Sequence, residues 1–329
     1  MIKMDNSIEI ENLTKIYGGN IKAVDNVTLK IGRGQVYGLL GQNGAGKTTL
    51  IKMLTGILKP TSGTAKIAGF DLNKDALKIR QITGVVPQDF TTDADLSGYE
   101  NLKLVADLYG VPKKEAEERI ETLLNMVDLY DVKNRRVSAY SGGMRKRLEL
   151  ICGLINTPEV LFLDEPTLGL DVTTRSNLWK YIKSIRDEFK ITIILTSHYL
   201  DEVDALSDRL SIMDHGKIIV SGTSDELKKS LKGDIITLRV KNDSEEKIVE
   251  NFKDAIEVKK MEMGDIRMKV NNSDVVLPEL MKYLASNNIS PESISIRKPS
   301  LDEVFIEYTG KHIDSEQKDY AKMMGFKQR

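Results

Sequence analysis

Short hydrophobic runs alternate with amphipathic segments in the part of the chain before residue 226. Apolar runs bounded by glycine predict strands, whereas apolar residues spaced three and four apart predict helices. The expected strands lie near residues 8–10, 24–31, 36–39 and 84–88, and the expected helical segments cover 49–58, 74–84 and 97–157. Strands that alternate with helices are typical of an α/β domain.

Two further apolar runs enclose a helical segment. The runs cover residues 159–164 and 191–196, and residues 173–187 between them have helical spacing. A strand, a helix and a second strand in this order predict a right-handed crossover between parallel strands. We therefore expect an α/β domain with a mixed sheet over residues 1–225, carrying a helical subdomain at about 97–157.

The pattern changes after a helix that ends near residue 233. The elements expected beyond it are a strand, a helix, two strands, a helix and a strand, at 234–242, 244–253, 255–262, 265–271, 273–287 and 292–297. This is the order of the ferredoxin-like arrangement, a small α+β fold. Ser300 and Glu303 have capping-box spacing and predict a last helix. We expect an accessory C-terminal domain over 226–310 and a flexible polar tail over 311–329.

Length and charge limit the function classes. A chain of 329 residues is long enough for two domains. The formal net charge of −1 argues against broad electrostatic capture of nucleic acid. No apolar stretch approaches the ~18 residues of a membrane span, and the first residues lack the apolar core of a signal peptide. The single cysteine, Cys152, lies in an apolar helical stretch and is expected in a core. These features predict a cytoplasmic protein.

Residues 41–48 fit the pattern G-x-x-x-x-G-K-[ST] of a phosphate-binding loop at every fixed position. The strand expected before this loop and the helix expected after it are the context that the pattern requires. Backbone amides and the positive end of the helix then face the phosphates. Lys47 is expected to reach the β- and γ-phosphates, and the Thr48 hydroxyl to bind Mg²⁺. The residues expected around the triphosphate are Gly41, Gln42, Asn43, Gly44, Ala45, Gly46, Lys47, Thr48 and Thr49.

A second chemical site follows the apolar run that ends at residue 163. Asp164 and Glu165 come directly after this expected strand, which places both acids at the carboxyl edge of the sheet, where α/β proteins bind ligands. We expect Asp164 to be the Mg²⁺ carboxylate. Glu165 is expected to accept a proton from the water that attacks the γ-phosphate, a role worth roughly 10²–10⁴-fold in rate.

Further motifs stand in order around these two sites. They are Gln88, then Ser141, Gly142 and Gly143, then residues 168–171 ending in Asp171, and finally His198. With the phosphate loop and the acid pair, they resemble the ATP-binding cassette (ABC) family over about residues 5–225. The resemblance implies an ATPase with a P-loop NTPase core that uses ATP and Mg²⁺. In that family the glutamine links Mg²⁺ and the attacking water to the helical subdomain, and the histidine contacts the γ-phosphate.

The resemblance also implies that ATP is held between two copies of the chain. Ser141, Gly142 and Gly143 open a helix, so that their amides form an anion site, and in the family this site faces the γ-phosphate of a second subunit. Asp171 belongs to the loop that crosses the dimer interface. Tyr17 is placed to stack on adenine, although a tyrosine packed in a core is the other interpretation.

Two segments narrow the resemblance. Residues 140–149 and 299–305 are similar to those of drug- and antibiotic-resistance export ATPases, in which a separate transmembrane permease carries the cargo. The resemblance implies a homodimer in the ATP-bound state, bound peripherally to the cytoplasmic face of the membrane through the permease. On the same analogy, residues 99–102 are a docking region.

Other functions fit less well. A GTPase needs an Asn-Lys-x-Asp motif, and the string at 73–76 lacks the final aspartate; a small-molecule kinase does not need Ser141, Gly142 and Gly143. The main alternative is a soluble ABC ATPase that acts on nucleic acid or ribosomes. The C-terminal domain, taken alone, also remains open as a small-molecule sensor, because a fold does not fix a function.

Overall fold

The structure is a computed structural model that describes residues 6–231, 233–240, 249, 251–260 and 265–310. The chain forms two compact units, Met1–Thr223 and Ser224–Arg329. The tail expected over 311–329 and most of the helix expected over 244–253 lie outside the described residues.

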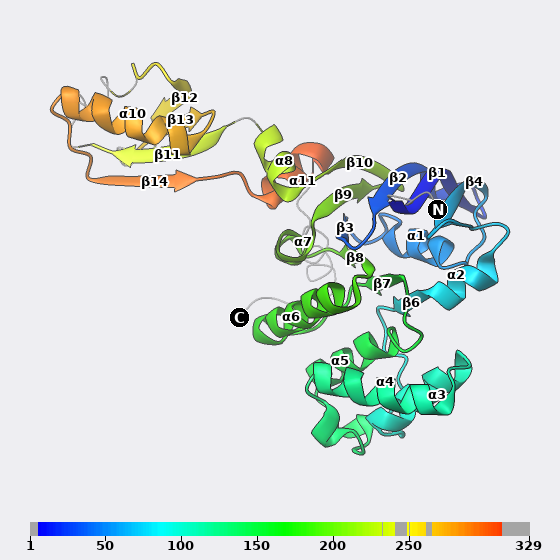
Figure 1. Cartoon of the computed structure of the whole chain (residues 1–329). Coiled ribbons are helices and arrows are strands. Elements are labelled where there is room, and N and C mark those ends of the chain that lie inside the picture. Colours follow the sequence, from blue (N-terminus) through cyan, green and yellow to red (C-terminus); the bar gives the residue numbers. More distant parts are fainter. Residues whose placement is uncertain (1–5, 232, 241–248, 250, 261–264, 311–329) are drawn as a thin grey trace, which may run out of the picture. The chain divides into compact units, whose positions relative to one another are not determined.

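The first unit contains an antiparallel sheet and a six-stranded, mainly parallel sheet (Figure 1). The antiparallel sheet has the order β2-β1-β4-β5, with bounds β1 Asn6–Tyr17, β2 Ile21–Gly32, β4 Ser62–Ile67 and β5 Phe70–Asp71. The second sheet has the order β10-β9-β3-β8-β7-β6, with bounds β10 Lys217–Gly222, β9 Arg209–Asp214, β3 Val36–Leu40, β8 Thr192–Ser197, β7 Val160–Asp164 and β6 Thr83–Val86. The α/β core expected from the sequence is thereby confirmed.

Strands β3, β7 and β8 are buried along their whole length. Strands covered on both faces read as continuous apolar runs, which is why the sequence revealed them. The sequence pattern predicted neither the strands β4, β5, β9 and β10 nor the helix α7 (Leu200–Leu206). β5 has only two residues, and exposed positions interrupt the apolar residues of β4 and β10.

Helices complete the first unit. The remaining helices are α1 Lys47–Leu54, α2 Ala76–Ile82, α3 Gly98–Leu108, α4 Lys113–Met126, α5 Gly142–Cys152 and α6 Val172–Phe189. Figure 1 shows α3, α4 and α5 grouped together as the helical subdomain. Their apolar faces, with Ile120, Leu124 and Leu148, form one buried cluster that also contains Cys152. The cysteine is thus a core residue, as expected.

Helix α1 ends earlier than the sequence pattern predicted. The expected helix ran over 49–58, but α1 stops at Leu54. Gly56 has a φ of 69°, in the left-handed region that ends helices, and the amides of Ile57 and Leu58 both donate to the Lys52 carbonyl. Ile57, which follows the end of the helix, is exposed.

The second unit contains an antiparallel sheet of order β12-β13-β11-β14. Its elements are α8 Ser224–Ser230, β11 Asp234–Arg239, β12 Ala255–Lys260, β13 Asp265–Val270, α10 Ser273–Ser286, β14 Ser293–Arg297 and α11 Leu301–Thr309. β13 separates β11 from β12, and β11 separates β13 from β14, which is the split βαβ order of the ferredoxin-like arrangement. The capping box expected at α11 forms between Ser300 and Glu303.

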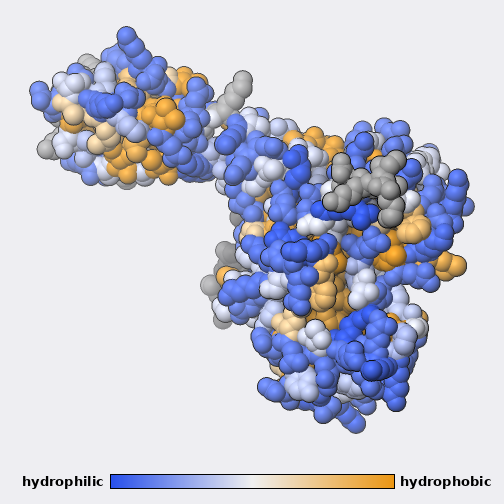
Figure 2. All heavy atoms as spheres, in the orientation of Figure 1, coloured by the Kyte–Doolittle hydropathy of each residue, from blue (hydrophilic) through white to orange (hydrophobic). Residues whose placement is uncertain are grey.

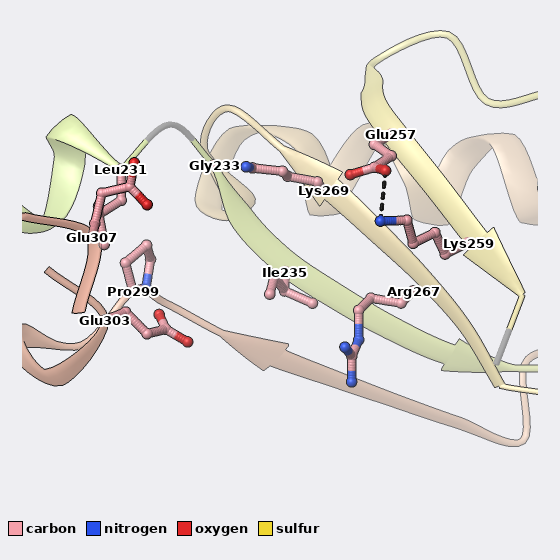
Figure 3. Close-up of a pocket in the computed structure, with 10 residues that line it drawn as sticks. All are labelled: Leu231, Gly233, Ile235, Glu257, Lys259, Arg267, Lys269, Pro299, Glu303 and Glu307. Atoms are coloured by element: carbon pink, nitrogen blue, oxygen red, sulfur yellow. Dashed lines mark ion pairs between the residues drawn. The ribbon is translucent and has the colours of Figure 1, made fainter. Parts of the chain in front are cut away.

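The sheet of the second unit has one buried and one polar face. Ile266, Met268 and Val270 on β13 are buried with Leu280 of α10 in a common core, while Arg267 and Lys269 between them line a cavity of about 320 Å³ on the other face. Figure 3 shows this cavity, which is also lined by Glu257 and Lys259, an ion pair at 2.8 Å. Figure 2 shows that hydrophilic side chains cover most of the visible surface, with hydrophobic residues in limited patches. Among the described residues, no helix is both long and apolar enough to cross a membrane.

Substitution of Gly84 tests the packing of α5 against the parallel sheet. A Cβ at Gly84 in β6 would overlap the carbonyl oxygen of Gly153, directly after α5. We predict that Gly84→Ala lowers the free energy of unfolding by about 1–3 kcal/mol, because such overpacking forces a backbone shift. Urea denaturation followed by fluorescence of Trp179, the only tryptophan, measures it. Gly18→Ala is the control, since no atom lies within 4 Å of the added Cβ; equal stability of the two variants would contradict the prediction.

Candidate functional site

The phosphate-binding loop joins β3 to α1 at the carboxyl edge of the parallel sheet. All nine expected residues, 41–49, lie in this loop or the first turn of α1. Gly46 precedes the helix with a φ of 104°, and a Cβ there would overlap the Ala23 carbonyl oxygen. Glycine is therefore required at this position by both backbone conformation and space.

Lys47 is held inside the loop. Its ammonium nitrogen donates to the carbonyl oxygens of Gly41 at 2.7 Å and Gln42 at 3.1 Å. The same nitrogen lies 3.4 Å from Glu165 Oε1, in an ion pair whose side chains are only 5% and 8% exposed. The loop therefore fixes a buried cation against the carboxylate that follows β7.

Asp164 is the last residue of β7, and one of its carboxylate oxygens accepts hydrogen bonds from two hydroxyl groups. Thr48 Oγ1 donates to Asp164 Oδ1 at 3.2 Å, and Thr196 Oγ1 of β8 donates to the same atom at 2.6 Å. Sequence reasoning found Thr48 and Asp164 but missed Thr196. The available signal was a polar residue that closes an apolar strand, at the same edge as the other motifs.

Glu165 follows Asp164 in a strained backbone conformation. Its φ is 50°, and its amide donates to Thr196 Oγ1 at 3.0 Å. Glu165 Oε2 lies 3.1 Å from His198 Nδ1. Burial raises the pKa of Glu165, but the hydrogen bond with His198 and the charge of Lys47 outweigh this effect and hold the pKa below its ordinary value. The side chain is therefore an ionised hydrogen-bond acceptor at neutral pH.

His198 lies directly after β8 and is buried. Its Nδ1 contacts Glu165, whereas its Nε2 is buried and has no hydrogen-bond partner among the residues that the structure describes. The Tyr199 ring packs against the imidazole with centroids 4.1 Å apart. The histidine is thereby held from two sides with one ring nitrogen left to bond a further group.

Gln88 lies two residues beyond β6, and β6 pairs with β7 in parallel. The glutamine thus sits at the same edge of the sheet. Its side chain is exposed, and no hydrogen bond joins it to Asp164 or Glu165 within the described part of the chain. Its backbone carbonyl instead accepts from Lys146 Nζ of α5 at 2.8 Å.

Ser141, Gly142 and Gly143 form the start of α5. Ser141 caps the helix by accepting from the Met144 amide at 3.3 Å. Asp171 caps α6, with hydrogen bonds to the Thr174 amide at 3.0 Å and hydroxyl at 2.6 Å, and a Cβ on Gly143 would overlap Thr174. These two helix starts lie side by side, and within the described residues no hydrogen bond links residues 141–143 to the phosphate loop.

Tyr17 lies at the end of β1 and is 42% exposed, with Lys15 Nζ 5.5 Å from the centre of its ring. The alternative of a tyrosine packed in a core is therefore wrong. An exposed ring at the end of β1 is available for stacking.

The chain is similar to known proteins over most of its length. The model of the ABC transporter family matches residues 24–168, and that of the ATP-binding protein DrrA1-3-like C-terminal domain matches residues 222–309. The daunorubicin resistance ATP-binding protein DrrA3 of Streptomyces coeruleorubidus is 37% identical, over 93% of this chain and 96% of its own length. The linearmycin resistance ATP-binding protein LnrL of Bacillus subtilis is 31% identical, over 92% of this chain and 98% of its own length.

Solved structures resemble the first unit. The structure of cbiO1 from Clostridium perfringens, part of an ABC transporter complex, has a TM-score of 0.64 at 31% identity, over 68% of this chain and 90% of that chain. A dimeric ATP-binding cassette in a post-hydrolysis state, bound to ADP and Pi, has a TM-score of 0.60 at 26% identity, over 66% of this chain and 98% of that chain.

The Lys47–Glu165 pair gives a stability prediction. Removing one partner of a buried pair leaves the other charge uncompensated, so Lys47→Met and Glu165→Gln should each lower the free energy of unfolding by about 1–3 kcal/mol. The double variant should lose at least about 1 kcal/mol less than the sum of both, because the attraction between the two side chains can be lost only once. Urea denaturation of the four proteins measures the coupling. The exposed pair Arg33–Glu159, at 3.6 Å, should couple by less than about 1 kcal/mol; equal coupling in both pairs would contradict the prediction.

Proposed function

The chain belongs to the ATP-binding cassette (ABC) transporter family, and from this premise we propose that it is the ATP-hydrolysing subunit of an exporter whose transmembrane subunits are separate chains. The observation that carries the proposal is the meeting of Lys47, Asp164, Glu165 and His198 at one edge of the parallel sheet. The resistance functions in the names of the similar proteins support export.

The geometry supports a division of roles in hydrolysis. Loop amides and Lys47 bind the phosphates, as in other phosphate loops. Ionised Glu165 accepts a proton from the attacking water while the bond from the γ-phosphorus to the bridging oxygen of ADP breaks. Nε2 of His198, which has no hydrogen-bond partner among the described residues, is available to the γ-phosphate, and the exposed ring of Tyr17 is available to adenine.

The donor set also fits Mg²⁺, which prefers oxygen ligands and is held by one or two protein groups together with phosphates. Thr48 and Asp164 supply a hydroxyl and a carboxylate that already lie 3.2 Å apart. Gln88 would join them if its exposed side chain turned toward this edge. When bound, the ion would neutralise charge that develops on the phosphates.

A second copy of the chain would complete each site. The starts of α5 and α6 make no hydrogen bond to the phosphate loop of their own chain within the described residues. Ser141, Gly142 and Gly143 present an exposed or half-exposed helix N-terminus, which attracts anions. We therefore propose a homodimer that closes on two ATP molecules, with Asp171 at the interface.

The docking region expected near residues 99–102 is only partly exposed. Asn101 and Leu102 are buried, because they face the core of the helical subdomain. The exposed apolar side chains on the same helix are Leu104, at 47% exposure, and Leu108, at 78%. They stand four residues apart on one face of α3, and we propose this face as the contact with the permease, which would hold the chain at the cytoplasmic side of the membrane.

Substitution of the base tests the catalytic assignment. We predict that Glu165→Gln lowers kcat for ATP hydrolysis by roughly 10²–10⁴-fold, preserves ATP binding and favours a stable ATP-bound dimer. Phosphate release and size-exclusion chromatography with ATP measure both effects. Lys47→Ala should instead weaken ATP binding by about tenfold or more, since it removes a charged hydrogen-bond donor. Near-normal turnover of Glu165→Gln would exclude Glu165 as the base.

A second experiment tests the partner. The double variant Leu104→Glu/Leu108→Glu should abolish co-purification of an integral membrane protein with the tagged chain, because charges at an apolar contact are costly to bury. ATP binding by the isolated chain should stay unchanged. Val275→Glu, at another exposed apolar position, is the matched control and should keep the partner. Recovery of ribosomes or nucleic acid with the unsubstituted chain, and of no membrane protein, would favour the soluble alternative.

A further inference from the structure

Three polar side chains of helix α5 bind the loop from Gln88 to Thr92. The loop follows β6 and has no regular secondary structure of its own. The three side chains belong to Arg145, Lys146 and Glu149 of α5. Each of them forms hydrogen bonds with the loop. None of these residues was singled out as functional from the sequence.

Glu149 provides the centre of the attachment. Its side chain is buried, and its Oε1 accepts from the amides of Thr91 and Thr92, each at 2.7 Å. Its Oε2 accepts from the Thr91 hydroxyl, also at 2.7 Å. Three bonds of 2.7 Å converge on this one side chain. Within the part of the chain that the structure describes, this buried side chain therefore finds its hydrogen-bond partners in one loop.

Arg145 binds Thr92, which Glu149 also contacts, and Lys146 binds the start of the loop at Gln88. Arg145 donates through Nε to Thr92 Oγ1 at 3.2 Å and through a terminal nitrogen to the Thr92 carbonyl at 2.9 Å. Lys146 Nζ donates to the Gln88 carbonyl at 2.8 Å. Both cations also lie over the Phe90 ring, at 4.3 Å and 4.9 Å from its centre, a favourable arrangement.

Backbone hydrogen bonds also attach the segment between this loop and α3. The Ser138 amide donates to the Ala94 carbonyl and the Val137 amide to the Leu96 carbonyl, at 2.8 Å and 2.9 Å. The Tyr99 amide donates to the Lys133 carbonyl at 2.9 Å. From Gln88 to the start of α3, the chain is thus bonded to residues 133–149. Pro87 joins the end of β6 to this attached segment.

We propose that Glu149, with Arg145 and Lys146, is a positioning residue that makes Gln88 move as one body with Ser141, Gly142 and Gly143. Because α5 is a continuous helix from residue 142 to residue 152, a displacement of its start displaces the loop as well. ATP contacted by the start of α5 in one subunit would therefore set the position of Gln88 beside the other ATP. This coupling rests on the proposed function, whereas the attachment itself does not.

Glu149→Leu tests the attachment in the full-length chain. It removes the acceptor but keeps an apolar side chain of similar length in the helix. Hydrogen–deuterium exchange should show at least about tenfold faster exchange of the Thr91 and Thr92 amides, with unchanged protection of β7. Glu149→Gln should restore protection, because its amide can still bond both partners. Glu118→Leu, on the exposed face of α4, is the matched control and should match the unsubstituted chain.

Hydrogen–deuterium exchange in the presence of ATP measures whether the loop and the start of α5 move together. In the unsubstituted chain, ATP should change exchange in residues 88–97 and 141–147 together, whereas in Glu149→Leu it should change 141–147 alone. The KM for ATP should stay within about twofold while kcat falls about tenfold or more, as expected for a group outside the binding loop. Arg145→Met, which removes two bonds from a half-exposed position, should give the same pattern more weakly and replaces Glu149→Leu if that variant does not fold.

Two results would overturn the inference. One is unchanged exchange of residues 88–97 in Glu149→Leu; the other is an ATP response that still joins both segments at normal kcat. Failure of the proposed function looks different. In that case the unsubstituted chain would not bind ATP, while the exchange of Thr91 and Thr92 without nucleotide would still report the attachment.

Discussion

Parallel pairing of β3, β8 and β7 is the constraint on which the whole site depends. Leu40 pairs with Ser197, and Asp164 pairs with Thr196. The three strands therefore end at one level, and the residues that follow them meet there. Parallel strands place the next residues at the same edge of a sheet, so the phosphate loop, Glu165 and His198 need no long loops to come together. Because every position on these strands is buried, a shift in register would force all their side chains to repack.

Each charged side chain at this edge of the sheet has several bonding partners. Lys47 bonds two loop carbonyls and pairs with Glu165, which in turn contacts His198. Asp164 is held by hydroxyl groups from two different elements. Buried charges are costly unless each has more than one partner, and a network of this kind keeps the side chains in place before any nucleotide arrives. The low pKa of Glu165 is a consequence of that arrangement.

The sequence predicted the parts of the fold whose signal is local. Buried strands such as β7 appear as unbroken apolar runs, and the phosphate loop depends on glycines at fixed spacing. The end of α1 was missed because Gly56 breaks the helix against a periodicity that continues to residue 58. The roles of Thr196 and Glu149 were missed for another reason. Their partners stand 32 and 58 residues away in sequence, and no periodicity reports such contacts.

The polar residues on α5 contribute to selecting one loop conformation more than to the stability of the helix. An apolar residue at position 149 would fit the same buried environment, between Leu148 and Leu150, without the cost of desolvating a charge. A carboxylate is tolerated there only while the amides of Thr91 and Thr92 face it. The loop is likewise held only while the helix presents those acceptors and donors. The loop and the helix therefore each select one conformation of the other. An apolar contact would not do this, because it is non-directional.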